Sequence, residues 1–109
     1  MFRSLVHTFL HFLVPALAAR FGWRDRPWRA YAVMIATMVV DLDHLLADPV
    51  FDPNRCSLGF HPLHSVAAVA IYALLAFVPE RRWLRLVAVG LLIHMGLDGL
   101  DCLWMGWER

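Results

Sequence analysis

Apolar residues fill four long runs, at 5–21, 30–46, 62–78 and 83–104, separated by short polar stretches. Each run is close to the roughly 20 residues that a helix needs to cross a bilayer. No run carries the continuous polar face of a helix in a water-soluble bundle. The pattern predicts an all-α, integral membrane four-helix bundle forming one domain over 1–109, with an irregular loop between helices 2 and 3. A soluble four-helix bundle is the alternative.

Composition supports a lipid environment. The chain has 109 residues, of which 61% are hydrophobic, and a mean hydropathy of +0.58. A chain this short cannot bury that much apolar surface in a water-soluble core, so membrane lipid is the expected partner. The net charge of +1 gives no basic surface for nucleic acid, and binding of nucleic acid is not expected. A homodimer is compatible with these short spans.

Arginine predicts the orientation of the spans. Seven arginines lie in the first and third connections and three lie elsewhere: Arg20, Arg24, Arg26, Arg29, Arg81, Arg82 and Arg85 against Arg3, Arg55 and Arg109. The positive-inside rule places the arginine-rich connections in the cytoplasm. We therefore expect an inner (cytoplasmic) membrane protein with both termini outside.

Ionisable residues interrupt all four apolar runs or lie at their ends. Apart from Arg20 and Arg85, which border the arginine-rich connections, they are histidines and aspartates: His7, His11, Asp41, Asp43, His44, His61, His64, His94, Asp98 and Asp101. Each such group costs on the order of 2.5–3.5 kcal/mol at membrane depth, which makes it a candidate for function. The expected topology brings the four sets to one level near the outer face, although the orientation argument did not use them. This agreement predicts a single site.

The spacing and side-chain types favour metal binding. His7 and His11, like His94 and Asp98, are four residues apart and share a helix face. Imidazole and carboxylate ligands suit Zn, Mn or Fe, and the share of histidine favours Zn. The expected ligands of one ion, or of two ions about 3.5–4 Å apart, are His11, Asp41, His44, His64, His94 and Asp98, with His7 and His61 as further ligands. A metal-free relay of protons through the same groups is the alternative.

The connection at 48–60 has two Asp-Pro steps, which favour turns over helix. It is interpreted either as a lid over the site or as a plain connection. Cys56 in this loop and Cys102 in the fourth run would both lie at the outer face, where they could form a disulfide or stay free thiols.

Three sequence elements together resemble a known family. They are Asp41-Leu42-Asp43-His44, the run from Phe60 to Ser65 that contains His61-Pro62-Leu63-His64, and His94 with Asp98. The series is similar to that of the YdjM-type membrane-bound metal-dependent hydrolases. With the Asp52 to Cys56 segment, the chain more closely resembles a small bacterial membrane-protein family of unknown function. The resemblance covers nearly the whole chain, and it implies metal binding and hydrolysis.

The resulting hypothesis is a membrane-integral metal-dependent hydrolase. A bound ion would lower the pKa of a water molecule to about 7, and Asp43 or Asp101 would take up its proton. An amphiphilic substrate such as a lipid-like phosphoester suits a site at headgroup level, and Arg55 could hold its phosphate. Two alternatives are a metal-binding transporter or sensor and a non-catalytic membrane protein held by a polar network.

Overall fold

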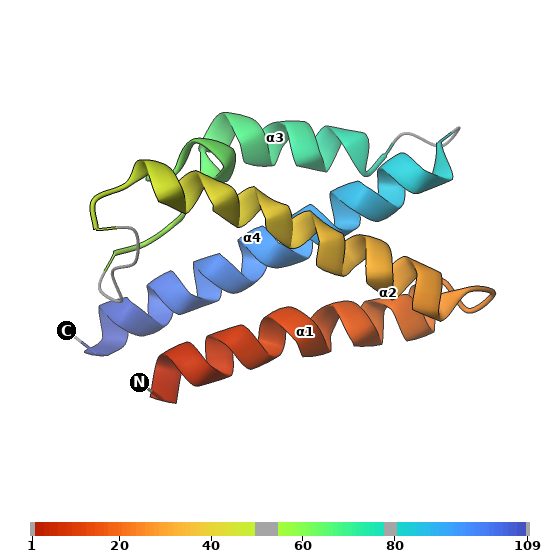
Figure 1. The fold of residues 1–109 in the computed structure, drawn as a ribbon, viewed down its shortest axis with the longest axis horizontal. Coiled ribbons are helices and arrows are strands. Elements are labelled where there is room, and N and C mark those ends of the chain that lie inside the picture. Colours follow the sequence, from red (N-terminus) through yellow and green to blue (C-terminus); the bar gives the residue numbers. More distant parts are fainter. Residues whose placement is uncertain (1, 50–54, 78–80, 109) are drawn as a thin grey trace.

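The computed structural model describes residues 2–49, 55–77 and 81–108, and these residues form helices and turns without any strand. The described residues form four α-helices and two 3₁₀ segments, and Figure 1 shows how the helices are arranged. In chain order the elements are α1 (Phe2–Gly22), α2 (Pro27–Ala36), η1 (Thr37–Leu46), η2 (Pro62–His64), α3 (Val66–Leu75) and α4 (Arg82–Glu108). The predicted all-helical class is confirmed for the described residues. By length and composition, α1 and the Arg82–Trp107 part of α4 could each cross a membrane.

Local sequence explains where the shorter helices begin. Pro27 occupies the first turn of α2, where a missing N–H costs little. Ser65 precedes α3, and its hydroxyl oxygen accepts a hydrogen bond from the backbone N–H of Ala68 at 3.2 Å. That bond satisfies one of the N–H groups left without a partner at a helix start. α3 therefore begins four residues later than the predicted third span.

The second apolar run differs from a plain α-helix. It starts as α2 and continues as η1, which has about three residues per turn. Residues three apart then fall on one line, and the buried residues of η1 are Thr37, Val40 and Asp43. The 3₁₀ geometry explains why Asp43 points inward, which an α-helical spacing from Asp41 and His44 did not predict.

The third apolar run is shorter than expected. Instead of one helix over 62–78, it forms η2 and then α3, which has ten residues and ends at Leu75. Ten α-helical residues extend about 15 Å, half of the roughly 30 Å hydrocarbon layer. None of the residues of α3 is buried.

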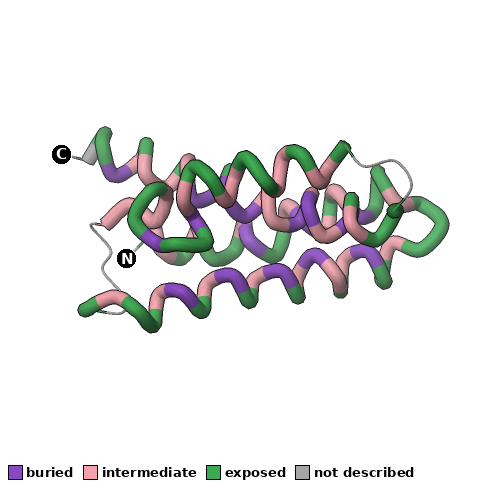
Figure 2. The backbone as a smooth tube through the Cα atoms, turned by 90° about the horizontal axis from the view of Figure 1, so that it is seen from above, coloured by how far each residue is buried: buried purple, intermediate pink, exposed green. Residues whose placement is uncertain are grey.

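α1, α2 and α4 pack against one another, and α3 packs against α4. Ala19 of α1, Ala30 and Met34 of α2 and Leu86 of α4 form a buried apolar cluster. Buried positions recur at intervals along the tube in Figure 2, on the faces that meet inside the bundle. Gly90 permits the closest approach, because a Cβ atom there would lie 2.9 Å from Thr37 Oγ1 and 3.1 Å from Met34 Cα.

Large apolar side chains also cover the outside of the bundle. Phe9, Phe21, Leu74 and Leu103 are each more than 60% exposed, and many others share this position. An apolar surface of this extent marks a protein that contacts lipid or another apolar partner.

The loop between η1 and η2 is tied to α4 by a disulfide between Cys56 and Cys102, whose Cα atoms are 5.2 Å apart. Of the two alternatives for these cysteines, the structure has the disulfide. The lid interpretation of 48–60 depends on residues 50–54, which lie outside the described residues. They include Asp52, Pro53 and Asn54 of the Asp52 to Cys56 segment.

Candidate metal centre

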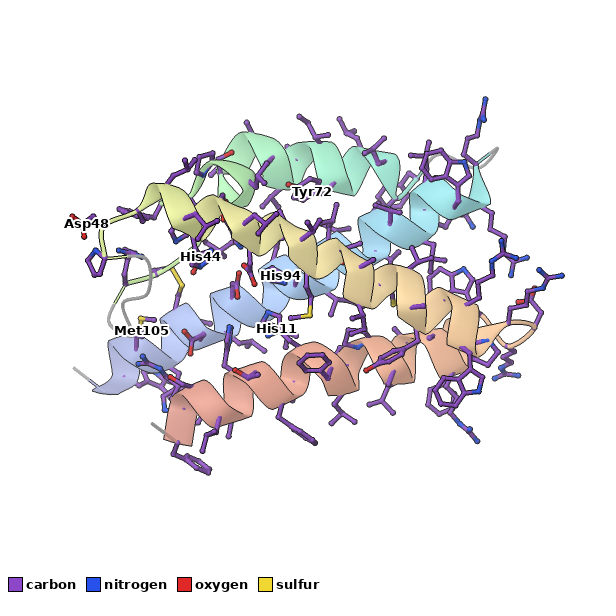
Figure 3. All side chains as sticks on the ribbon, viewed as in Figure 1. His11, His44, Asp48, Tyr72, His94 and Met105 are labelled. Carbon is purple, nitrogen blue, oxygen red and sulfur yellow. A yellow bond between two sulfur atoms is a disulfide. The ribbon has the colours of Figure 1, made fainter. Side chains whose placement is uncertain are left out.

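The histidines and aspartates converge between α1, η1, η2 and α4, in the half of the bundle that holds both chain ends (Figures 1 and 3). Figure 3 shows His11, His44 and His94 directed into the space between these elements. His11, His61, His64, His94, Asp43 and Asp98 are all buried. The sequence prediction that four separate apolar runs deliver these residues to one region is confirmed by the structure.

Four of the predicted ligands form one compact group: Asp41, His64, His94 and Asp98. Asp41 Oδ1 lies 3.0 Å from His94 Nε2 and 3.3 Å from His64 Nε2. Asp98 Oδ2 lies 3.1 Å from His64 Nε2 and 3.2 Å from His94 Nε2, and the two Nε2 atoms are 3.2 Å apart. Ligands about 2.0–2.1 Å from a tetrahedral zinc ion are about 3.3–3.4 Å from one another. The spacing of this group therefore fits a single divalent ion.

A second group consists of His7, His11 and Asp98. Asp98 Oδ1 lies 3.2 Å from His7 Nε2 and 3.4 Å from His11 Nε2. The two carboxylate oxygens of Asp98 thus face two different sets of imidazoles. Each oxygen of the Asp98 carboxylate could therefore contribute a ligand atom to a separate metal ion.

Hydrogen bonds on the far side of the rings direct the ligand nitrogens. Because a carboxylate only accepts, His64 Nδ1–H donates to Asp43 Oδ2 at 2.9 Å, which leaves the His64 Nε2 lone pair facing the first group. His11 Nδ1–H donates to the carbonyl oxygen of His7 at 2.8 Å, which directs its Nε2 to the second group. Such outer partners fix the tautomer of metal-binding histidines.

Proton counting also favours a cation in the first group. The oxygens of Asp41 and Asp98 carry no proton when ionised, and His64 holds its proton on the side of Asp43. Neutral imidazoles therefore place at most one proton, that of His94, among the four converging atoms. Asp98 Oδ2 is buried without a hydrogen-bond partner among the described residues, as is His94 Nδ1. A divalent cation would bind Asp98 Oδ2 and the other three converging atoms at once and would leave the proton of His94 on Nδ1, whereas a metal-free network needs additional protons on the rings.

Asp43 holds the first group in place from outside. Its Oδ2 accepts from His64 Nδ1–H and from the backbone N–H of Leu63, both at 2.9 Å, and its Oδ1 lies 3.2 Å from His44 Nδ1. These contacts occupy both oxygens and tie η1 to η2. They favour a positioning role for Asp43, while its predicted role as a base stays a prediction.

His44 and His61 lie beside Asp43 as a third group of potential ligands. Their rings stack with centroids 3.8 Å apart. His44 Nδ1–H donates to the carbonyl of Asp41 at 3.0 Å, and Ser57 Oγ lies 3.4 Å from His44 Nε2. Both nitrogens of His44 thus have protein partners, so His44 is placed outside the first group. Burial and the neighbouring His44 lower the pKa of His61, which keeps this ring neutral near pH 7.

The remaining predicted residues lie at the edge. Asp101 Oδ1 lies 4.0 Å from His7 Nδ1 and 3.2 Å from Arg3 Nε. The guanidinium of Arg55 covers the ring of Phe60, with 4.6 Å between Cζ and the centroid. The substrate role predicted for Arg55 stays a prediction.

Two residues near the site were not predicted, Arg3 and Ser57. Arg3 is buried and precedes His7 and His11 by four and eight residues, so the three share one face of α1. That spacing was visible in the sequence. The contact of Ser57 with His44 depends on the loop path and had no sequence signal.

Comparison with protein families gives a match over residues 1–105, nearly the full chain. The chain belongs to DUF6122, a family of unknown function. No curated protein and no solved structure matches the chain. The match to a family of unknown function agrees with one part of the expected resemblance, and the link to YdjM-type hydrolases stays a hypothesis.

Proposed function

We propose that the chain is a membrane-integral, metal-dependent hydrolase that cleaves a phosphoester in a lipid-like substrate. The observation that carries this proposal is the position of Asp98, whose two carboxylate oxygens face two separate sets of histidine ligands. Asp41, His64, His94 and Asp98 would hold one ion, and His7, His11 and Asp98 a second. When bound, divalent ions lower the pKa of water and withdraw charge from phosphoryl oxygens.

The second set supplies three ligand groups, one fewer than the first. Catalytic zinc sites commonly have three protein ligands and keep a position for water or substrate. We therefore assign substrate binding to the side of His7 and His11. Zn fits this mixed imidazole and carboxylate set, and Mn or Fe are the other candidates.

Asp101 and Arg3 lie on the side of His7 and His11. Asp101 lies beside His7, and its carboxylate would accept a proton from the attacking water. Arg3 contacts the same carboxylate and carries a permanent positive charge, which would stabilise charge on a phosphoryl oxygen. The leaving alcohol would take its proton from solvent.

A membrane location accounts for the apolar exterior. α1 and α4 are long enough to cross the hydrocarbon layer, and α2 with η1 extends about 35 Å at the usual rise per residue. The short α3 would cross only part of the layer beside α4. We propose that both termini and the metal centre lie on the outer side of the inner membrane, from the arginine distribution. A reporter enzyme fused to Arg109 that is active only in the periplasm tests this orientation.

Activity is tested with detergent-purified protein and a panel of phosphate monoesters and diesters with and without acyl chains. We expect Zn- or Mn-dependent cleavage of an amphiphilic ester, lost in Asp98→Ala and retained in Asp48→Asn, an exposed aspartate at the same end. Metal-loaded protein that cleaves no member of the panel, or Asp98→Ala with full activity, would contradict the hydrolase proposal.

A further inference from the structure

A hollow lies at the opposite end of the bundle from the metal centre. It is formed where the turn after α1, the start of α2 and the start of α4 meet, which Figure 1 shows at the end away from both termini. Its volume is about 560 Å³, within the range of small-molecule sites. No residue of the candidate metal centre lines it.

Positive charge dominates the walls of this hollow. Four arginines line it, and Asp25 is the single acidic residue among its lining residues: the arginines are Arg26, Arg29, Arg81 and Arg82. Asp25 Oδ1 accepts from Arg82 Nη2 at 2.7 Å, and this bond lowers the pKa of Asp25, so the carboxylate is ionised near pH 7. The described part of the chain offers no carboxylate partner to Arg26, Arg29 or Arg81.

Three arginines that line one hollow, without a carboxylate partner among the described residues, repel each other. Membrane orientation requires arginines on one side of the bilayer, but it does not require that they surround a cavity. The other arginines of the same two connections, Arg24 and Arg85 among them, do not line it. The convergence therefore indicates an anionic ligand.

The rest of the lining suggests what kind of anion. The rings of Trp23 and Trp83 contribute walls, and Ala30, Val33 and Leu86 contribute apolar surface. Tryptophan favours the headgroup level of a membrane. Arginine matches phosphate oxygens by paired hydrogen bonds.

We propose that this hollow, the arginine pocket, binds a phosphate-bearing anion with two or more negative charges. An anionic phospholipid headgroup is the source that the apolar and tryptophan walls favour, because basic pockets between membrane helices bind such headgroups. A soluble phosphate or diphosphate shares the recognising chemistry. The inference does not depend on the proposed hydrolase function, since the two sites share no residue.

The test compares two double variants of the full chain in neutral detergent. Arg26→Gln/Arg29→Gln removes two charges from the arginine pocket, and Arg20→Gln/Arg24→Gln removes two charges from the same connection outside it. Binding of cardiolipin, phosphatidylglycerol, phosphatidylcholine and inorganic pyrophosphate is followed by tryptophan fluorescence and by the unfolding temperature.

We expect cardiolipin to bind at least tenfold more weakly to Arg26→Gln/Arg29→Gln than to the wild type, and within twofold of the wild type to Arg20→Gln/Arg24→Gln. Binding should weaken with salt. Competition by pyrophosphate with the same variant dependence assigns the pocket to soluble anions, and failure to compete assigns it to the lipid headgroup. Equal losses in the two double variants, or equal binding of phosphatidylcholine, would overturn the proposal. Unchanged metal content in both variants keeps this outcome separate from the metal centre.

Discussion

The two ends of the bundle use ionisable side chains in opposite ways. At the metal-centre end His64, His94 and Asp98 are at most 5% exposed and have one another as neighbours. At the arginine end the Asp25–Arg82 pair, although closer at 2.7 Å, has side chains that are 53% and 66% exposed. Exposed pairs contribute little to stability, whereas buried charges must be compensated. Short distances alone therefore do not identify the important site, and burial does.

Removing one ionisable side chain at each end gives the largest expected difference in the free energy of unfolding. In chelator-treated protein, His94→Ala removes an imidazole that contacts both the buried Asp98 and the adjacent Asp41, and removing a partner of a buried charge costs up to about 3–5 kcal/mol. Arg29→Ala changes an exposed side chain and should shift the free energy of unfolding by less than about 0.5 kcal/mol. Unfolding in detergent measures both, and equal losses would remove the distinction between the two ends.

A conservative substitution tests Asp43, which accepts a hydrogen bond from His64 on the side of the ring away from the first group. Asp43→Asn keeps the size of the side chain but removes the charge that orients His64. Loss of such a partner typically lowers metal affinity about 10–100-fold. Zn titration against a competing chelator measures the change, and Asp48→Asn, an exposed aspartate nearby, is the control with unchanged affinity. Unchanged affinity in Asp43→Asn would show that Asp43 does not position a ligand.

How much of the fold and of the candidate metal centre could be predicted from the sequence depends on how far apart the contacting residues are along the chain. Spacings of four residues placed His7 with His11 and His94 with Asp98, because a helix fixes such faces locally. The inward turn of Asp43 could not be predicted, since it depends on the 3₁₀ geometry of η1. The double contact of Asp98 required knowing that His7 of α1 and His64 of η2 both reach this residue of α4, which no local pattern encodes.

The helix contact between the two ends can be weakened without touching either. Gly90→Ala would place a Cβ atom 2.9 Å from Thr37 Oγ1 and force α2 and α4 apart, at a cost of about 1–3 kcal/mol. Gly96→Ala in the same helix has nothing within 4 Å and should stabilise by about 0.5–1 kcal/mol. Unfolding temperatures of the two variants are compared; a gain in stability for Gly90→Ala would mean that α2 and α4 do not pack this closely.

The smallest effect is expected at the exposed pair of the arginine end. Asp25→Asn removes the hydrogen bond to Arg82 and should leave the unfolding temperature unchanged at pH 7. Because the folded-state pKa of Asp25 is lowered, any contribution is present above the ordinary carboxyl pKa and is lost as pH falls. In a pH series, any small difference between wild type and Asp25→Asn should therefore disappear in acid. A clear loss at pH 7 would show that this pair supports the fold.

The most direct measurement is the metal content of detergent-purified protein by elemental analysis after saturation with Zn or Mn and removal of excess ion. Two equivalents are expected in wild type and in Asp48→Asn, one in His7→Ala, and none in Asp98→Ala, because Asp98 contributes to both groups. Wild type that takes up no ion would contradict the metal centre and leave a metal-free network of protons as the better explanation. Asp98→Ala that retains both ions would contradict the role of Asp98 as the ligand shared by the two groups.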